Sequence, residues 1–217
     1  MKKIIICFVL ISFYNQPLTG QVKTLFSKIS PEMSGVNFSN IIVETKDFNA
    51  LTYGYLYNGG GVAIGDINND GLPDLYFSGS MVTNKLYLNE GNFKFKDITE
   101  SAGVDGGKGF KTGVTFVDIN NDGLLDIYLC KSALSDPELR RNILYVNNGN
   151  MTFTDKAKEY GLDDASFSTQ AYFYDMDVDG DLDLFLLNHP PEMQYANKIQ
   201  LTYDPKGKLV AQQDTQY

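Results

Sequence analysis

Three segments of the 217-residue sequence repeat one pattern of oxygen-bearing residues, D-x-[DN]-x-D-G-x-x-D, beginning at Asp66, Asp118 and Asp175. The glycine at position 6 lets each segment fold back on itself, so side-chain oxygens at positions 1, 3, 5 and 9 converge. The backbone carbonyl at position 7 adds another oxygen. The predicted ligands are Asp66, Asn68, Asp70, Leu72 and Asp74 in the first loop, Asp118, Asn120, Asp122, Leu124 and Asp126 in the second, and Asp175, Asp177, Asp179, Asp181 and Asp183 in the third.

An all-oxygen ligand set suits a hard divalent cation, and Ca²⁺ tolerates irregular six- to eight-fold coordination better than Mg²⁺ does. Carboxylates held within a few ångströms of one another repel unless a cation lies between them. We therefore expect about one Ca²⁺ per loop, three in this chain, and no organic cofactor.

An EF-hand and a polar hairpin turn are two other interpretations of the loops. An EF-hand needs flanking helices and a bidentate Glu at position 12, whereas position 12 is Phe77, Leu129 and Leu186, each in an apolar run. This excludes an EF-hand. A polar hairpin turn would explain a single copy. Three copies in phase, each with the additional aspartate at position 9, favour a metal site.

The elements that position the loops are short predicted strands. Runs rich in Val, Ile, Tyr and Phe alternate with Asn/Asp/Gly turns, and the first unit contains four strands. The turns at 89–92 and 147–150 have the Asn and Gly residues of hairpins. The predicted strands are Gly61–Gly65, Leu75–Gly79, Lys85–Leu88 and Asn92–Ile98. Four short strands at a period of about 50 residues are typical of a β-propeller blade.

The predicted organisation has five parts. A signal peptide (1–20) is followed by an N-terminal segment (21–57), repeat 1 (58–110), repeat 2 (111–168) and an incomplete repeat 3 (169–217). In the N-terminal segment, Phe26–Ile29 followed by Gly35-Val36 echoes the end of repeat 1. We expect it to supply the last strand of a blade and so close the propeller, although an unrelated N-terminal cap would also fit. Repeat 2 carries a six-residue insertion around 132–141, predicted to be a surface loop.

The signal peptide is indicated by Lys2 and Lys3, the apolar run Ile4–Phe13 and the small residue Gly20. The run is too short to cross a bilayer, which takes about 20 residues, and a buried N-terminal strand is the alternative. Because Cys7 lies inside the run, lipidation there is rejected. After cleavage no transmembrane segment remains, and the chain would be secreted, periplasmic or at the cell surface. The remaining thiol, Cys130, is expected to be a buried small hydrophobe.

The charge of the chain is concentrated in the loops. The sequence has 18 Lys+Arg, 27 Asp+Glu and a net charge of −9. This balance argues against nucleic acid or an anionic membrane surface as a partner. Eleven of the 27 acidic residues fall in the three nine-residue loops, as three, three and five. Much of the acidity therefore comes from predicted metal ligands.

The repeated units resemble FG-GAP/VCBS repeats, the calcium-binding blades of the integrin α-subunit propeller. The segments Tyr57–Asp66 and Phe95–Val104 are similar to bacterial secreted relatives of cartilage acidic protein. The resemblance implies an all-β fold, a seven-bladed propeller with Ca²⁺ in its blade loops, and an exported protein engaged in surface binding. About three of seven blades are present, and no second hairpin is recognisable in 192–217. We therefore expect an N-terminal fragment, without a claim to an ASPIC/UnbV-type domain.

Two classes of function follow. The first is a non-enzymatic, exported adhesion or ligand-binding module with an unidentified protein or glycan ligand. The alternative is the propeller domain of a secreted polysaccharide-active hydrolase or lyase. The loop spacing uses the carboxylates as metal ligands and leaves no catalytic set. His189 is the single histidine and is expected to be a loop residue, and the glycine-rich segment 58–65 lacks the features of a phosphate-binding loop.

Overall fold

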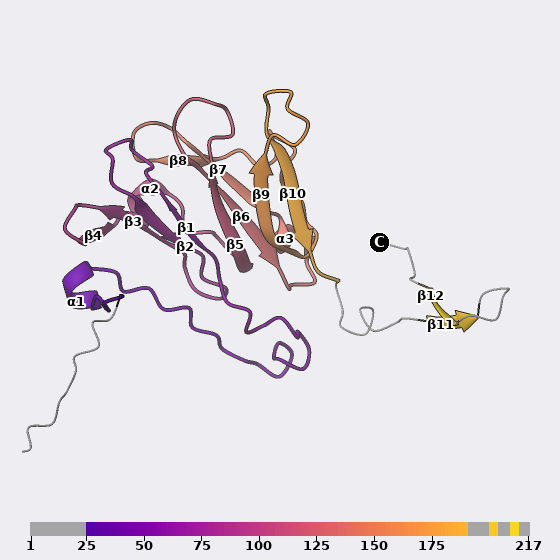
Figure 1. The fold of residues 1–217 in the computed structure, drawn as a ribbon. Helices are drawn as coiled ribbons and strands as arrows, with labels where there is room; N and C mark the ends of the chain where they lie inside the picture. The colour runs from indigo at the N-terminus through magenta and orange to yellow at the C-terminus, as the bar shows by residue number, and fades with distance from the viewer. Residues whose placement is uncertain (1–24, 191–199, 204–208, 213–217) are drawn as a thin grey trace, which may run out of the picture.

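The computed structural model describes residues 25–190, 200–203 and 209–212 (Figure 1). The predicted signal peptide and Cys7 lie outside the described residues. The described chain is all-β, as predicted. Its strands are β1 (Val62–Gly65), β2 (Asp74–Phe77), β3 (Lys85–Asn89), β4 (Phe95–Asp97), β5 (Phe110–Val117), β6 (Asp126–Ser132), β7 (Ile143–Asn147), β8 (Phe153–Asp155), β9 (Ser168–Tyr174), β10 (Asp183–Asn188), β11 (Gln200–Tyr203) and β12 (Leu209–Gln212), and its helices are α1 (Pro31–Ser34), α2 (Thr99–Ala102) and α3 (Pro137–Arg140).

Two four-stranded antiparallel sheets have the same topology. Their strand orders are β1-β2-β3-β4 and β5-β6-β7-β8, so each strand pairs with its neighbour in sequence. A third sheet contains β9 and β10. We call these sheets blades 1, 2 and 3. They lie side by side in chain order (Figure 1), as the blades of a partial propeller do. The four strands predicted for the first unit are confirmed to within a few residues at each end.

The outer hairpins of blades 1 and 2 use one turn device. The Asn89 side-chain oxygen accepts a hydrogen bond from the Gly91 N–H at 2.9 Å, and Asn147 binds Gly149 in the same way at 3.0 Å. Both glycines have positive φ, 81° and 74°. This conformation is accessible to glycine without steric cost. The two predicted hairpins are thereby confirmed.

A further hairpin follows blade 3 in the chain. In the structure β11 pairs antiparallel with β12, in a sheet separate from β9 and β10. The residues between these strands, Asp204–Lys208, contain Pro and Gly but lack the Asn-x-Gly signature of the other two hairpins. The motif of the outer hairpins is therefore not recognisable after blade 3, and β11 and β12 form a hairpin in a sheet of their own.

The core lies between blades. One apolar cluster joins Ala63 and Tyr76 of blade 1 to Val114 and Ile127 of blade 2. A second cluster joins the opposite face of blade 2 to Ala171 and neighbouring residues of blade 3. Cys130 belongs to the second cluster and is fully buried, as predicted. Burial raises the pKa of its thiol to about 12. Each blade therefore depends on its neighbours to shield its apolar side chains from water.

The two ends of the three-blade stack expose the faces that are buried inside it. Tyr128 of blade 2 is 0% exposed against blade 3, but its counterpart Phe185 in blade 3 is 53% exposed. On the other face, Val114 of blade 2 is 4% exposed, and its counterpart Val62 in blade 1 is 53% exposed. Apolar patches of this kind are typically covered by a partner surface. Further blades of the same kind would cover both.

Glycines let the innermost strands approach closely. Gly61 donates its N–H to the Thr112 carbonyl at 2.8 Å, and a β-carbon at Gly61 would lie 2.6 Å from the Val114 nitrogen. At Gly113 a β-carbon would lie 2.4 Å from the Thr169 carbonyl oxygen. The glycine-rich segment 58–65 therefore enters β1, as the sequence suggested, and has no helix after it.

The N-terminal segment contacts blade 1 as blade 1 contacts blade 2. The Asn37 N–H donates to the Tyr87 hydroxyl at 3.2 Å, and the Gly106 N–H donates to the Tyr145 hydroxyl at the same distance. Tyr87 and Tyr145 occupy equivalent positions of β3 and β7. Residues around 37 thus take the place of the chain that leaves a preceding blade.

The strand expected at 26–29 does not form in this structure. The segment that follows it is α1, which ends at Gly35 with φ 79°, just as α2 ends at Gly103 with φ 75°. The helical turn after the expected strand is therefore preserved. Leu25 and Phe26 are almost fully exposed. A lone extended segment has no ladder of hydrogen bonds, because a strand requires a partner edge.

The insertion in repeat 2 forms α3 and lies at the surface, as predicted. Asp136 caps α3 by accepting a hydrogen bond from the Glu138 N–H. The Arg140 guanidinium lies 4.3 Å from the centre of the Phe167 ring and donates to the Ala165 carbonyl. These contacts hold the insertion against the connection between blades 2 and 3.

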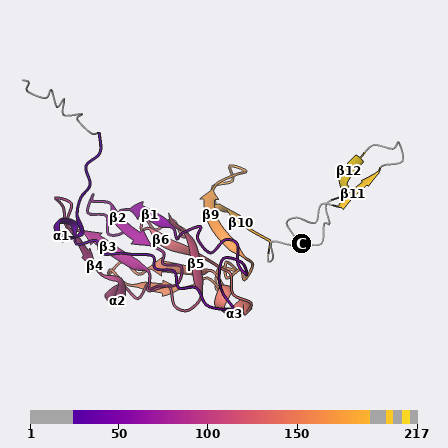
Figure 2. The same cartoon turned by 90° about the horizontal axis from the view of Figure 1, so that it is seen from below.

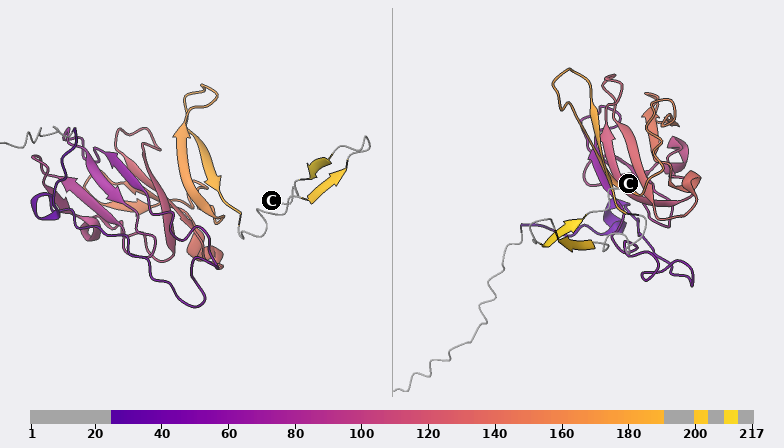
Figure 3. Two further views of the ribbon diagram at one scale, coloured as in Figure 1. Left: turned by 60° about the horizontal axis from the view of Figure 1, so that its bottom comes forward. Right: turned by 90° about the vertical axis from the view of Figure 1, so that its right-hand side faces the viewer.

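His189 joins three parts of the chain that are distant in sequence. Its Nε2 lies 2.9 Å from the Ser132 hydroxyl of β6 and 3.0 Å from the Tyr53 hydroxyl. Its Nδ1 lies 2.6 Å from the Pro190 carbonyl oxygen, which can only accept, so Nδ1 carries the proton and Nε2 accepts. The Tyr55 ring lies against the imidazole, with the ring centres 4.2 Å apart and the ring planes tilted by 31°. The N-terminal segment, which passes along the bottom of the blades in Figures 1 and 3, is anchored at this junction.

Figure 2 shows the same stack from below, with β9 and β10 beyond β5 and β6. Within the part of the chain that the structure describes, no helix has the length and apolar character needed to cross a membrane.

The junction predicts a pH dependence of stability. Burial lowers the pKa of His189 from its ordinary value of 6.5. Below about pH 6.5 the unfolded chain binds a proton that the folded chain does not, so the free energy of unfolding should fall with decreasing pH. Chemical denaturation between about pH 7 and pH 5 measures this. His189→Gln, which cannot titrate, should flatten the dependence. Parallel curves for the two proteins would contradict the prediction.

Candidate metal centre

The three acidic loops share one backbone conformation. Position 4 has positive φ in each: Asn69 at 59°, Asn121 at 56° and Val178 at 63°. The glycine at position 6 also has positive φ in all three loops, where it is Gly71, Gly123 and Gly180. These two left-handed residues reverse the chain within each loop. Each loop joins the first and second strands of its blade, and that of blade 3 projects at the top of Figure 1.

The aspartate at position 1 organises the loop from inside. In the first loop, Asp66 accepts the Gly71 N–H at 2.7 Å on one oxygen and the Asp70 N–H at 3.2 Å on the other. The same two bonds recur at Asp118 and Asp175. The oxygen that accepts from the glycine makes only this one bond, so it keeps a lone pair free for a cation. The position-5 aspartate accepts the N–H of position 7 in every loop.

The aspartate at position 9 ties the loop to the sheet. Asp74 accepts the Ile67 N–H of its own loop at 3.0 Å and the Asn89 N–H of β3 at 2.7 Å. Asp126 makes the equivalent bonds to Ile119 and Asn147 at the same distances. Both carboxylates are fully buried. Burial raises their pKa values, although the backbone donors oppose it.

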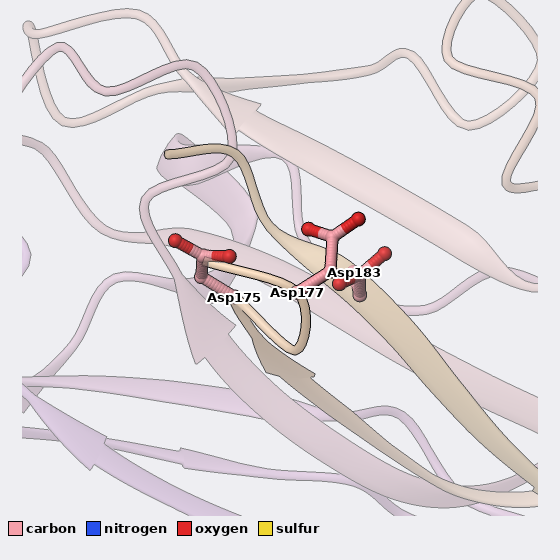
Figure 4. A group of neighbouring side chains, drawn as sticks. All are labelled: Asp175, Asp177 and Asp183. Carbon is pink, nitrogen blue, oxygen red and sulfur yellow. The ribbon is translucent and has the colours of Figure 1, made fainter. Parts of the chain in front are cut away.

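The third loop brings three predicted ligands together. Ligand oxygens of Asp175, Asp177 and Asp183 all lie within 4.8 Å of one another. Figure 4 shows these side chains around the turn between β9 and β10. Oxygens that share one Ca²⁺ at about 2.3–2.6 Å are separated by up to roughly 5 Å. The donor set and its spacing therefore fit a calcium ion.

The other predicted ligands are less convergent. Within the described residues, Asp179 is outside this group, and the first two loops contain no comparable group of three carboxylates. In those loops position 3 is an asparagine whose amide N–H₂ donates to the position-5 carboxylate: Asn68 to Asp70 at 2.9 Å and Asn120 to Asp122 at 2.8 Å. The amide oxygen of each asparagine accepts the N–H of position 5, at 3.3 Å in the first loop and 3.1 Å in the second. The carbonyls of position 7 remain predicted ligands.

The third loop contains five aspartates, whereas each of the other two loops contains three, so its carboxylates repel one another most. The neighbouring Asp179, by a hydrogen bond and by its charge, raises the pKa of the Asp181 carboxyl. Asp183 and Asp177 add to this effect.

The first and second loops are linked to each other. The Asn69 side chain donates to the Gly123 carbonyl at 2.9 Å. The Asn147 side chain donates to the Ile67 carbonyl at 2.9 Å, while the Asn147 N–H binds Asp126. Two hydrogen-bonded bridges therefore run between adjacent loops. This link could not be read from the sequence, because it depends on how the blades stack.

Comparison with known proteins agrees with this architecture. The family described as FG-GAP-like repeat matches residues 66–129, which run from the first acidic loop through the second loop and into β6. With the four-stranded blades and repeated acidic loops, this match shows that the chain contains FG-GAP-like repeats.

The chain is similar to vertebrate proteins named cartilage acidic protein 1. The chain is 33% identical over 145 residues to that of Xenopus tropicalis, an alignment covering 66% of this chain and 22% of the relative. It is 34% identical over 101 residues to those of Mus musculus and Homo sapiens, covering 46% of this chain and 15% of each relative. The chain thus spans about a fifth or less of these proteins.

Val178 provides a test of the loop conformation. A β-branched residue at positive φ is strained, by about 1–2 kcal/mol, whereas asparagine tolerates that conformation. Val178→Asn should therefore raise the free energy of unfolding by about 1 kcal/mol, measured by urea denaturation. The reverse change at the equivalent position, Asn121→Val, is the matched control and should lower it. No gain from Val178→Asn would show that loop 3 relaxes in solution.

Proposed function

We propose that the chain is part of an exported calcium-binding β-propeller that acts as a non-catalytic adhesion or ligand-binding module at the cell surface. The observation that carries the proposal is the convergence of Asp175, Asp177 and Asp183 in a loop that the chain repeats three times. The proposal assigns the loops a structural task. Calcium would neutralise each carboxylate group and hold the loop rigid at one end of its blade.

Support for a multi-bladed propeller comes from the exposed faces of blades 1 and 3. Their apolar side chains match those that are buried between blades, so additional blades would stack on both sides. A closed ring of seven blades is the arrangement we propose for the whole protein. Ligand binding would then occur on the surface formed by loops at one end of the ring.

Support for a non-catalytic role comes from the use of the acidic residues. The position-1 and position-9 aspartates are tied to backbone N–H groups in their loops. The Ser132–His189 pair resembles a nucleophile and base, but Ser132 is fully buried beneath the N-terminal segment. A buried hydroxyl without access for substrate cannot act as a nucleophile. The hydrolase or lyase alternative has no support in these contacts.

Calcium binding is tested by titration calorimetry of the full chain. We expect about three Ca²⁺ per chain, and Asp175→Ala should remove one because it deletes a ligand of the third loop. Asp177→Asn is the matched variant: it gives loop 3 the donor set of loops 1 and 2. This variant should still bind three Ca²⁺, but its affinity for the ion of loop 3 should fall by about tenfold, since lower ligand charge lowers affinity. Absence of calcium binding by the wild-type chain would overturn the calcium proposal.

The binding role is tested with arrays of glycans and surface proteins, screened with and without EDTA, beside a panel of polysaccharide substrates. A binding module should retain ligands only with calcium and release no product. Asp66→Ala and Asp118→Ala should abolish retention. Turnover of a polysaccharide that persists in these two variants would favour the enzyme alternative instead.

A further inference from the structure

Two buried lysines in blade 2 face each other across a strand pair. Lys111 of β5 and Lys131 of β6 are directly opposite in the antiparallel register. Such partners project from the same face of the sheet, with β-carbons about 4.5–5.5 Å apart. Lys111 is 3% exposed and Lys131 is 5% exposed. Like charges in this arrangement are unfavourable, and burial increases the cost.

Neither lysine has an ion-pair partner among the described residues. The Lys111 ammonium approaches the Gly107 carbonyl at 3.5 Å, a long contact, and Lys131 makes no side-chain hydrogen bond there. The Asp155 carboxylate acts on Lys131 through space and the Asp105 carboxylate acts on Lys111, but neither lies within ion-pair distance of its lysine. Burial, and for Lys111 the neighbouring Lys131 charge, lower the pKa values of both lysines.

One of the two lysines, Lys131, lines a cleft of about 520 Å³. Lys131 lines it together with Lys158 and Arg141, and Arg141 is held by ion pairs to Glu138 at 2.9 Å and to Asp163 at 3.0 Å. Its volume is in the range of small-molecule sites, about 300–1,000 Å³, and exceeds the size of a bare ion. The cleft therefore has room for a molecule that carries a charged group.

The glycine-rich loop 106–109 packs on the lysines. A β-carbon at Gly109 would lie 2.7 Å from the Lys131 Cε atom, and Gly109 has φ 110°. The glycine thus permits the loop to pack closely on the end of the lysine side chain, where the β-carbon would also lie 3.2 Å from the Lys131 Nζ atom. Lys108 in the same loop is exposed.

These features are particular to repeat 2. The positions equivalent to Lys111 and Lys131 in repeat 1 are Gly59 and Gly79, and repeat 1 also lacks the insertion that contains Arg141. The corresponding cleft of repeat 1 is lined by Lys85 and Asp97, which neutralise each other at 2.6 Å. A structural need common to all blades therefore does not explain the lysine pair.

We propose that this cleft binds an anionic sugar, whose carboxylate or sulfate group is held by Lys131, the lysine of the pair that lines the cleft. An oxyanion would form charge-assisted hydrogen bonds with the Lys131 ammonium group and offset its repulsion with Lys111. The acidic side chains on the rim, Glu138, Asp155 and Asp163, are acceptors for sugar hydroxyls. The site is independent of the calcium loops, so its test does not depend on calcium binding.

The test is a calorimetric titration of the full chain with sodium glucuronate, sodium sulfate and neutral glucose, at matched ionic strength. Both anions should bind and glucose should not. Lys131→Met keeps the aliphatic stem and should weaken anion binding about tenfold or more. Lys94→Met, which removes an exposed lysine from the β3–β4 turn, is the control and should change nothing. Asp155→Asn should strengthen binding because it removes a competing negative charge.

Folding of each variant is checked by its melting temperature. Lys131→Met should melt at or above the wild-type temperature in anion-free buffer, since it removes one of two like charges. If it fails to fold, the exposed rim variant Lys158→Met replaces it and should weaken anion binding severalfold. No binding of either anion by the wild-type chain, or equal binding by the wild-type and lysine variants, would overturn the proposal.

Discussion

A four-stranded sheet whose two faces are both apolar cannot be stable alone in water, and this constraint governs the structure. Each blade has side chains such as Tyr76 or Tyr128 that become dry only when the next blade covers them. The close approach of the innermost strands, the glycines that permit it and the apolar clusters between sheets all follow from this need. Like other repeat architectures, the chain gains stability through neighbour interfaces as well as through each unit.

The acidic loops are built into the same arrangement. Asp74 and Asp126 lie where the loop chemistry meets the sheet: each is a predicted ligand, yet each also binds backbone N–H groups of its loop and of the third strand. A change at the loop is therefore transmitted to the hairpin. The bridges from Asn69 to Gly123 and from Asn147 to Ile67 extend this connection to the adjacent blade.

Much of the fold could be predicted from the sequence, because repetition and turn chemistry are local signals. The strands around the loops and the Asn-Gly hairpins were identified from residue types alone. The hairpin of β11 and β12 gave no such signal, because its turn has a different composition. The strand expected at 26–29 does not form, because a strand depends on a partner edge as well as on its own residues.

The site was predictable in composition and less so in geometry. The sequence identified Asp175, Asp177 and Asp183 but gave Asp179 equal weight, although it lies outside their group. The burial of Asp74 could have been suspected, since it immediately precedes an apolar strand. The pairing of Lys111 with Lys131 could not, because their register is set by an irregularity between Lys111 and Val114 in β5.

The junction at His189 has a consequence for the order of folding. Tyr53 and His189 are 136 residues apart, so their contact closes a long loop. A ribosome releases the N-terminal segment well before it has made the histidine that anchors it. Blade 1 can associate with blade 2 while synthesis continues, but the segment around Tyr53 gains its anchor only after the first two strands of blade 3 have emerged. The N-terminal segment is thus synthesised early but anchored late. Until it is anchored, its aromatic side chains are accessible to chaperones.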